Sequence, residues 1–167
     1  PLTWIKDISE KEWDEVMNVN LKGPFLLLQS SLKHFMKKNY GKVVFTSSIT
    51  GTAVSASGHA HYAATKSGLM GLVKTAAVEL SQYNININAI IPGNIMSEGM
   101  KFERGDEYIK SQAKSIPMGR LAETEEVGKV VSFLASDESS YITGQGIIVD
   151  GGQTAPENQD EVFHPKN

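Results

Sequence analysis

The chain has 167 residues, of which 40% are hydrophobic and 21% are charged, and its formal net charge is -3. This composition is typical of a globular protein. The sequence contains no long run of like charge that would attract nucleic acid or an acidic membrane surface. Cysteine is absent, which excludes disulfides, thiolate metal ligands and a cysteine nucleophile.

The cellular location is predicted from what the sequence lacks. No apolar run approaches the roughly 20 residues that a helix needs to span a bilayer, and the absence of cysteine fits a reducing compartment. We therefore expect a cytoplasmic protein without a membrane partner. The chain opens at Pro1 without a methionine or a signal peptide, and we interpret it as a fragment or a processed product.

The first half of the chain predicts two helices that flank one strand. Apolar residues at helical spacing predict a long helix over residues 9–38, with a bend or boundary at Gly23-Pro24 and a left-handed cap at Gly41. The apolar, β-branched run 42–46 predicts a strand buried in a parallel sheet. Residues 47–58 are rich in small polar residues and predict a loop. Residues 60–82 predict a helix whose small side chains allow close packing.

The second half alternates in the same way. Residues 85–91 predict a strand that is stopped by Pro92-Gly93, whereas 94–117 lack clean periodicity apart from a possible helix over 106–115. Thr124 is predicted to cap a helix that runs to about Ser136, and 146–152 predict a final strand and turn. This order predicts an α/β fold, a doubly wound parallel sheet of the Rossmann-like type. We expect one catalytic portion over residues 1–152 and a loose polar tail over 153–167.

A tyrosine and a lysine lie four residues apart in the second predicted helix. Tyr62 and Lys66 would therefore share one face, one turn apart. A nearby ammonium favours the ionised form of a phenol, and a phenol held in this way can act as a general acid or base. The alternative interpretation is an exposed helix pair without a role, since such a spacing often occurs by chance.

Two serines follow the first predicted strand. Ser47 and Ser48 stand beyond its carboxyl end, which is where sites lie in open parallel sheets, and the helix with Tyr62 begins nearby. A serine hydroxyl there can hydrogen-bond a carbonyl or alkoxide oxygen. The alternative is that both serines satisfy loop backbone groups. The next strand ends at Pro92-Gly93 on the same sheet edge, so several strand ends are predicted to converge on one crevice.

Several segments together resemble the short-chain dehydrogenase/reductase family, from about Trp13 to Gly152. They are, in the family's order, NVNLKG (18–23), SSITG (47–51), YAATKSG (62–68), NAIIPG (88–93), PMGRL (117–121), FLASD (133–137), and ITGQ (142–145) with VDGG (149–152). The nearest resemblance is to bacterial cytoplasmic members similar to 3-oxoacyl-carrier-protein reductases and to sugar or polyol dehydrogenases.

The resemblance implies a catalytic set of Asn20, Ser48, Tyr62 and Lys66. It implies that Tyr62 exchanges a proton with the substrate oxygen, and that Lys66 assists Tyr62 and holds the nicotinamide ribose. It implies that Ser48 orients the substrate oxygen, with Ser47 as the rival that the position of Gly51 disfavours. Asn20 matches an asparagine that anchors a water relay toward Lys66; the alternative is an asparagine packed inside the helix.

The resemblance also implies an oxidoreductase that uses NAD or NADP. Besides Tyr62 and Lys66, the residues that match cofactor-binding positions are Pro92, Gly93, Ile95 and Ser97, the last standing where the family often has threonine. Residues 94–117 match the family's variable substrate lid, in which Met96, Met100 and Phe102, together with Met118 beside it, suggest an adaptable, partly apolar pocket for a small carbonyl or alcohol.

Other candidates carry weaker signals. His59 and His61 flank the predicted site, so one of them could contact substrate, although loop histidines without a ligand role are the more common case. We expect no metal site, because the acidic residues of the lid fit a solvated face and Asp150-Gly151-Gly152 fits a tight turn.

One part of the family pattern is missing. No glycine-rich turn of the type G-x-x-x-G-x-G precedes a helix, so the half that cradles the cofactor pyrophosphate is absent from this sequence. We expect an unpaired sheet edge as a result. Two hypotheses follow: the chain is part of a complete enzyme, or it is a truncated, non-catalytic remnant or a subunit that needs a partner to supply the dinucleotide-binding half. Enoyl reduction is a third possibility on the same scaffold.

The resemblance further implies a homo-oligomer. The helices that begin near Trp13 and Ala60 resemble the pair that family members use to form dimers, and the last helix and strand resemble a second interface. We therefore expect a homotetramer built from dimers.

Overall fold

A computed structural model describes residues 2–157, and the side chains of all of these except Lys101, Glu103 and Arg104. The predicted tail therefore lies outside the described residues from position 158 onward. The helices are α1 (Glu10–Met17), the π-helical turn η1 (Asn18–Lys22), α2 (Gly23–Lys38), α3 (Ile49–Thr52), α4 (Ala60–Leu80), η2 (Ser81–Tyr83), α5 (Glu98–Lys114), α6 (Thr124–Leu134) and η3 (Asp137–Ser139). The strands are β1 (Gly41–Thr46), β2 (Ile85–Pro92), β3 (Ile95–Met96), β4 (Ala122–Glu123) and β5 (Gly146–Val149).

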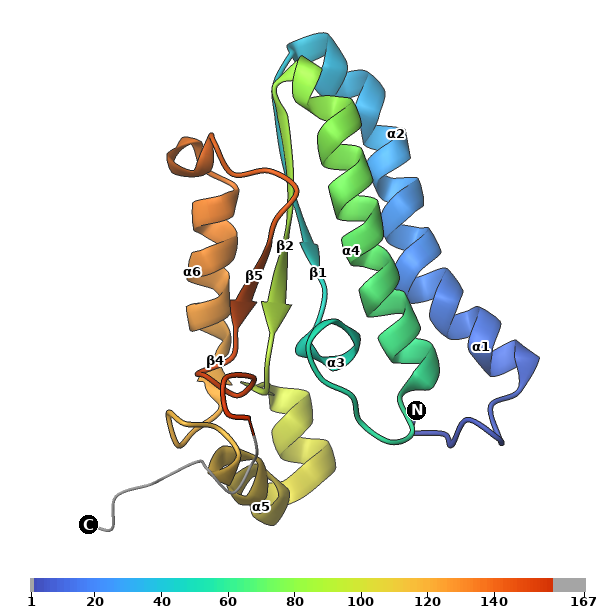
Figure 1. Ribbon diagram of the computed structural model, residues 1–167, viewed down its shortest axis with the longest axis vertical. Helices are drawn as coiled ribbons and strands as arrows, with labels where there is room; N and C mark the ends of the chain where they lie inside the picture. The colour runs from blue at the N-terminus through green and yellow to red at the C-terminus, as the bar shows by residue number, and fades with distance from the viewer. Residues whose placement is uncertain (1, 158–167) are drawn as a thin grey trace.

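The sheet has the parallel order β1-β2-β5, as the alternation of helices and strands predicts. Val43 lies opposite Ile87, and Ile90 lies opposite Ile147. Helices α4 and α2 lie on one side of this sheet and α6 on the other, while α3 and α5 lie near the carboxyl ends of the strands (Figure 1). The α/β class with helices on both faces is therefore confirmed. A second, two-stranded parallel pair joins β3 to β4.

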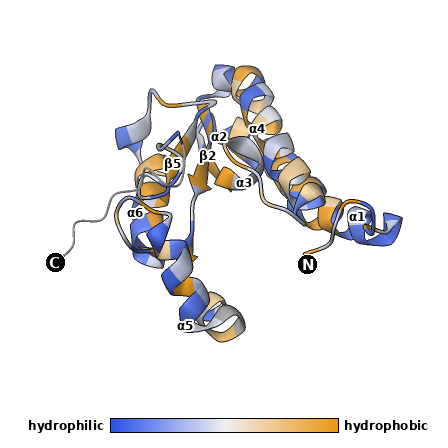
Figure 2. Ribbon diagram, turned by 60° about the horizontal axis from the view of Figure 1, so that its bottom comes forward, coloured by the Kyte–Doolittle hydropathy of each residue, from blue (hydrophilic) through white to orange (hydrophobic). Residues whose placement is uncertain are grey.

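The core lies between the sheet and α4. Strand β2, which lies between α4 and α6 (Figure 2), is almost wholly buried, and its residues are apolar except for Asn86 and Asn88. Leu69 and Val73 of α4 are no more than 1% exposed and pack with Ile85 and Ile87 of β2. Burial on both faces accounts for the mostly apolar composition of the strand, and the buried Asn88 side chain is hydrogen-bonded to backbone groups.

Small residues on α4 permit the close helix packing that the sequence predicts. A Cβ atom added at Gly68 would lie 3.0 Å from Leu21 Cδ2, so the glycine lets α4 approach the π-helical turn. Gly71 faces open space, and a Cβ atom added there would have no neighbour within 4 Å. The close approach is therefore confined to one face of the helix.

The predicted helix over residues 9–38 is continuous but contains a π-helical turn at Asn18–Lys22. The Gly23 N–H donates to the Asn18 carbonyl, a bond that spans five residues instead of four. Pro24 has no N–H to donate to the carbonyl of Asn20, which favours such a change of register. The Gly23-Pro24 step thus marks a widened turn within one long helix.

Three predictions about helix ends and extents are wrong. Asn39 (φ 50°) is the left-handed residue that ends α2, and Gly41 instead opens β1; asparagine tolerates this conformation and so replaces the expected glycine. Helix α6 is capped by Glu123, which forms a reciprocal capping box with Glu126, and not by the Thr124 hydroxyl. The lid contains a longer helix than expected, α5, which is kinked at Gly105 (φ 75°); the kink interrupts its periodicity.

Replacing Leu69 with alanine is expected to lower the free energy of unfolding by about 3 kcal/mol. The side chain is 1% exposed and belongs to the core, so its loss leaves a cavity that the sheet cannot fill. Val78 lies on the same helix with 79% exposure, and Val78→Ala is expected to change stability by no more than about 0.5 kcal/mol. Urea denaturation of both variants tests this; equal losses would contradict the packing described here.

Candidate active site

The carboxyl ends of β1 and β2 and the first turn of α4 meet at a cavity of about 710 Å³. Of the residues predicted to be catalytic or to bind the cofactor, this cavity is lined by Asn20, Ser48, Tyr62 and Gly93. They come from four separate segments of the chain. Three of the four predicted catalytic residues, all except Lys66, thus line one cavity beyond the carboxyl ends of the strands.

The two candidate serines have different surroundings. Ser47 is 2% exposed, and its hydroxyl donates to the Lys66 carbonyl at 2.8 Å. Ser48 caps α3, accepting a hydrogen bond from the Thr50 N–H at 3.2 Å, and it lines the cavity. The Ser48 hydroxyl still has its own proton to donate. Ser47 ties β1 to α4, whereas Ser48 is the serine that a ligand can reach.

Lys66 lies one helical turn beyond Tyr62, between that residue and the end of β1. Its Nζ atom is 5.4 Å from the centroid of the Tyr62 ring and donates to the Thr46 carbonyl at 2.9 Å. Burial lowers the pKa of the Lys66 ammonium below its ordinary value. The hydrogen bond to β1 thus holds the Lys66 ammonium beside the Tyr62 ring and sets the direction of its remaining N–H groups.

Asn20 lies in the π-helical turn η1 and lines the cavity. The residue four positions later is Pro24, so the usual helical donor to the Asn20 carbonyl is missing. A π-helical turn is often found at functional sites because it widens the helix locally. The turn places Asn20 on the same side as Tyr62.

The predicted cofactor residues after β2 are spread over a longer stretch. Pro92 ends β2, Gly93 lines the cavity, and Ile95 belongs to β3. The Ser97 hydroxyl accepts a hydrogen bond from the Met100 N–H and caps α5. Four of the residues predicted to bind the cofactor do not line the cavity, namely Lys66, Pro92, Ile95 and Ser97.

The two histidines differ in exposure. His59 is partly exposed, its Nδ1 lies 3.1 Å from the Ser57 carbonyl, and its ring meets the Tyr62 ring edge-on at 6.0 Å. His61 is wholly buried, with its Nε2 atom 3.0 Å from Glu12 Oε1. Glu12 was not identified from the sequence. The only signal was the spacing of Ser9 and Glu12, which is that of a capping box.

The lid only partly has the predicted apolar lining. Met100 lines the cavity, and so does Tyr108, which no motif in the sequence singles out. Phe102 is 94% exposed and Met118 is 64% exposed. The prediction that these two line the pocket is therefore wrong, because each lies on the outward side of its segment. Asn94 joins the lid to the cavity, since its side chain donates to Gln112 of α5 at 2.8 Å.

The turn after β5 braces the same region. Asp150 accepts hydrogen bonds from the Gly152 and Thr154 N–H groups, as expected for a tight turn. The Gln153 side chain accepts a hydrogen bond from the Asn94 N–H at 3.2 Å. Gln153 and Thr154, which the sequence assigns to the tail, are therefore hydrogen-bonded to the end of the sheet.

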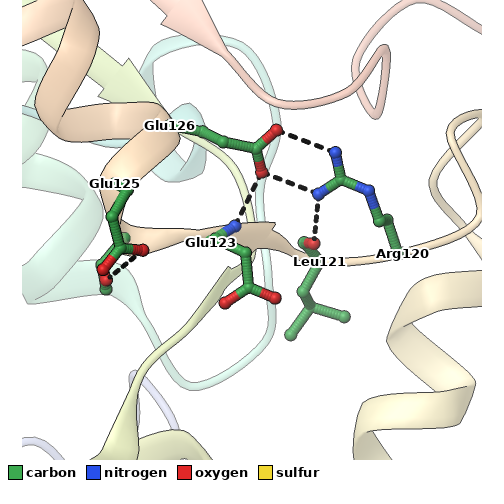
Figure 3. A network of polar contacts seen from close by, with 6 residues as sticks. Arg120, Leu121, Glu123, Glu125 and Glu126 are labelled. Atoms are coloured by element: carbon green, nitrogen blue, oxygen red, sulfur yellow. Dashed lines mark hydrogen bonds and ion pairs between the residues drawn. The ribbon is translucent and has the colours of Figure 1, made fainter.

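A network around Arg120 fixes the start of α6 after the lid (Figure 3). Arg120 donates to both carboxylate oxygens of Glu126, at 2.7 and 2.8 Å, and also to the Leu121 carbonyl. Glu126 in turn accepts from the Glu123 N–H. The Arg120 hydrogen bonds, and then that from Glu123, lower the pKa of Glu126 from 4.5 to about 2.

The contribution of this pair to folding is expected to be fully present above about pH 4.5 and to be lost as the pH falls through about 2. The pKa of Glu126 is lower in the folded protein, so protonation favours the unfolded chain. In Arg120→Ala, the pKa of Glu126 should rise toward its ordinary value. An NMR titration of the Glu126 carboxyl carbon measures this pKa in the wild type and in the variant. The same titration curve in both proteins would contradict the role of Arg120.

Two features are absent from the part of the chain that the structure describes. None of the helices over residues 2–157 is both long and apolar enough to cross a bilayer. Within the same residues, no three histidine, cysteine or acidic side chains gather as metal ligands would.

Comparison with known proteins identifies relatives along nearly the whole chain. A family model described as Enoyl-(Acyl carrier protein) reductase matches residues 2–154. The 3-oxoacyl-[acyl-carrier-protein] reductase FabG of Thermotoga maritima is 45% identical over 146 residues, which cover 87% of this chain and 58% of FabG. The oxidoreductase UcpA of Salmonella typhimurium is 39% identical over 159 residues, which cover 91% of this chain and 60% of UcpA.

A solved structure gives the same result. A gluconate 5-dehydrogenase from Burkholderia cenocepacia, crystallised with NADP and tartrate, superposes with a TM-score of 0.87 at 27% identity, over 93% of this chain and 61% of that one. The chain thus spans about 60% of the length of these relatives. By its matched sequence and its fold, the chain belongs to the short-chain dehydrogenase/reductase family.

Proposed function

We propose that this chain carries the catalytic residues of an oxidoreductase that transfers a hydride between NAD or NADP and a carbonyl or secondary alcohol. One observation supports this above the others: Ser48 and Tyr62 line the same cavity, with the Lys66 ammonium 5.4 Å from the Tyr62 ring. The named activities of the relatives, reduction of 3-oxoacyl groups and oxidation of gluconate, involve such a carbonyl or alcohol carbon.

We propose the following roles for the residues at the site. A bound nicotinamide would supply or accept the hydride. In the reducing direction Tyr62 donates its phenolic proton to the substrate oxygen, while the Ser48 hydroxyl hydrogen-bonds that oxygen and orients the carbonyl. Lys66 stabilises the phenolate that remains. Asn20 is proposed to hold a water through which a proton returns toward Lys66.

The residues present fit one part of the cofactor. Tyr62 and Lys66 share one helical face beside the cavity, and the ammonium can donate to ribose hydroxyls. The nicotinamide would lie along the end of β2 and the residues after it, namely Pro92, Gly93, Ile95 and Ser97. The sequence holds no glycine-rich turn for the pyrophosphate, so the fit extends only to the nicotinamide end of the molecule.

Isotope transfer tests the proposal in the complete protein that contains this chain. Reduced NAD or NADP that carries deuterium at both C4 positions of the nicotinamide is supplied together with a panel of 3-oxoacyl thioesters and keto sugars. The expected result is a product that carries deuterium at the new carbinol carbon. Failure to transfer deuterium to any of the carbonyls contradicts the proposal.

Enoyl reduction is a second candidate, because the matching family model carries that description. In that reaction the hydride reaches a carbon–carbon double bond instead of a carbonyl. The Ser48 hydroxyl beside Tyr62 is better suited to a carbonyl oxygen that becomes an alkoxide. Adding enoyl thioesters to the same deuterium assay separates the two reactions by the position of the label.

The exposed edge of the sheet favours a third candidate, a subunit that works with a partner. Within the described residues β1 pairs only with β2, and a groove of about 520 Å³ runs along it, lined by Leu27, Leu28, Phe35 and other side chains. A partner that supplies the dinucleotide-binding half would cover this edge. The native mass and a cofactor titration of the 167-residue chain test this: weak binding alone and tight binding in a heavier complex support it.

We also propose a cytoplasmic homo-oligomer. Phe25 and Leu26 are each at least 42% exposed on α2, and exposed apolar residues of this kind are commonly covered by another subunit. A dimer or a tetramer in sedimentation analysis would support this proposal, and a monomer at high concentration would contradict it.

A further inference from the structure

Among the residues that the structure describes, His61 is a buried titratable residue that the proposed reaction does not use. It directly precedes Tyr62 and is 0% exposed. Both ring nitrogens are hydrogen-bonded: Nδ1 lies 2.9 Å from the Tyr62 backbone N, and Nε2 lies 3.0 Å from Glu12 Oε1. Glu12 comes from α1, 49 positions earlier in the chain.

These partners fix which ring nitrogen carries the proton in the neutral imidazole. A backbone N–H can only donate, so Nδ1 accepts and carries no proton. Nε2 then carries the proton of the neutral ring and donates it to Glu12. The Thr3 hydroxyl donates to the same oxygen of Glu12 at 2.5 Å. Glu12 therefore acts as an ionised acceptor, and these bonds, that from Thr3 first, lower its pKa.

The bond to Tyr62 serves a helix end whose N-cap residue makes no capping hydrogen bond with its side chain. The first N–H groups of a helix lack partners within it, and His59, the N-cap residue of α4, provides no side-chain hydrogen bond. The imidazole of His61 fills this role for the N–H of Tyr62 itself. The spacing of Ser9 and Glu12 would allow Glu12 to close a capping box on α1, but its carboxylate instead bonds Thr3 and His61.

The same contacts attach the segment before α1 to the loop before α4. The Thr3 N–H donates to the Gly58 carbonyl at 3.1 Å, so this segment is bonded both to that loop and, through Glu12, to His61. Leu2 lines the cavity beside Tyr62. Three separate parts of the chain thus converge on the first turn of the helix that carries the predicted acid/base.

We propose that Glu12 and His61 are positioning residues that hold the first turn of α4, and with it Tyr62, in the orientation that catalysis requires. This rests on the proposed function, in which Tyr62 exchanges a proton with the substrate. A displacement of about 1 Å at a reacting group can cost about 100-fold in rate.

Spectroscopy on the complete protein tests the geometry without any need for turnover. In ¹⁵N-labelled protein the His61 ring should show a bare Nδ1 and a protonated Nε2. The Tyr62 amide should exchange slowly with solvent, and it should exchange at least tenfold faster in His61→Gln, which keeps a donor for Glu12 but lacks the Nδ1 acceptor. A protonated Nδ1, or an unchanged Tyr62 exchange rate in this variant, overturns the proposal.

Kinetics on the complete protein test the consequence. Glu12→Ala is expected to lower kcat by about 10- to 100-fold with KM nearly unchanged. Glu12→Gln keeps an oxygen that accepts from both Thr3 and His61, so it should restore kcat to within about threefold of the wild type. Asp14→Ala, on the exposed side of the same helix, is the matched control and should behave as the wild type.

The outcomes separate this inference from the proposed function. An unchanged kcat in Glu12→Ala, while Tyr62→Phe is inactive, overturns the positioning role alone. A loss of kcat in Glu12→Ala that Glu12→Gln does not restore also overturns it, because the hydrogen bonds would then not be the cause. Turnover of Tyr62→Phe above about a tenth of the wild-type value overturns the proposed function instead.

Discussion

Replacing Tyr62 with phenylalanine is expected to lower the turnover of the complete protein by about 10³-fold, without loss of folding. The change removes only the phenolic hydroxyl, which is the proposed proton donor, and general acid catalysis contributes on this scale. The ring remains to pack against His59 and to lie beside Lys66. Steady-state kinetics with saturating cofactor and a thermal melt measure the two effects separately.

Tyr141→Phe is the matched control for this change. Tyr141 is fully exposed, at 102% of its reference area, so the same deletion of a hydroxyl there should leave turnover unchanged. If Tyr62→Phe kept more than about a tenth of wild-type turnover, general acid catalysis by this residue would be too small to account for the reaction.

Replacing Gly51 with alanine is expected to lower the free energy of unfolding by about 3 kcal/mol. Gly51 has φ +96°, and a Cβ atom there would lie 2.4 Å from the Ala63 carbonyl oxygen and 2.8 Å from Ala63 Cα. Both contacts are with backbone of α4, which cannot move aside without shifting the first turns of the helix. The Gly51 carbonyl also accepts a hydrogen bond from Ser67.

Chemical denaturation measures this loss, and Gly71→Ala is its matched control. Gly71 lies within α4, and a Cβ atom added to it would meet no other atom within 4 Å. An added methyl there should be neutral or stabilise the helix by up to about 1 kcal/mol. If Gly51→Ala were as stable as Gly71→Ala, the close contact between α3 and α4 would be wrong.

The parts of the fold that the sequence predicts well are those with a strong local pattern. Strand β2 alternates isoleucine with asparagine and then becomes wholly apolar up to Pro92, and α4 carries small and apolar residues at helical spacing, so the predicted bounds of both agree with the structure to within two residues. The kinked helix α5 was missed over its first turns, because Gly105 interrupts the pattern and most of its side chains face solvent.

The candidate site also has features that the sequence predicts and features that it does not. The gathering of Ser48, Tyr62 and Gly93 follows from a general property of parallel sheets, that strand ends meet at one edge. The bond between Glu12 and His61 joins residues 49 positions apart, and no local pattern indicates it. The sequence also does not predict the π-helical turn at Asn20, because a proline in a helical pattern is compatible with a kink, a helix end or a widened turn.

The proposed mechanism is tested most directly by a crystal structure of the complete protein with a nicotinamide cofactor and an unreactive carbonyl ligand. We expect the Tyr62 hydroxyl and the Ser48 hydroxyl both to lie within roughly 3.2 Å of the same ligand oxygen, with Lys66 between Tyr62 and the ribose. A ligand oxygen that is held by other groups, with Tyr62 and Ser48 turned away from it, would contradict this mechanism.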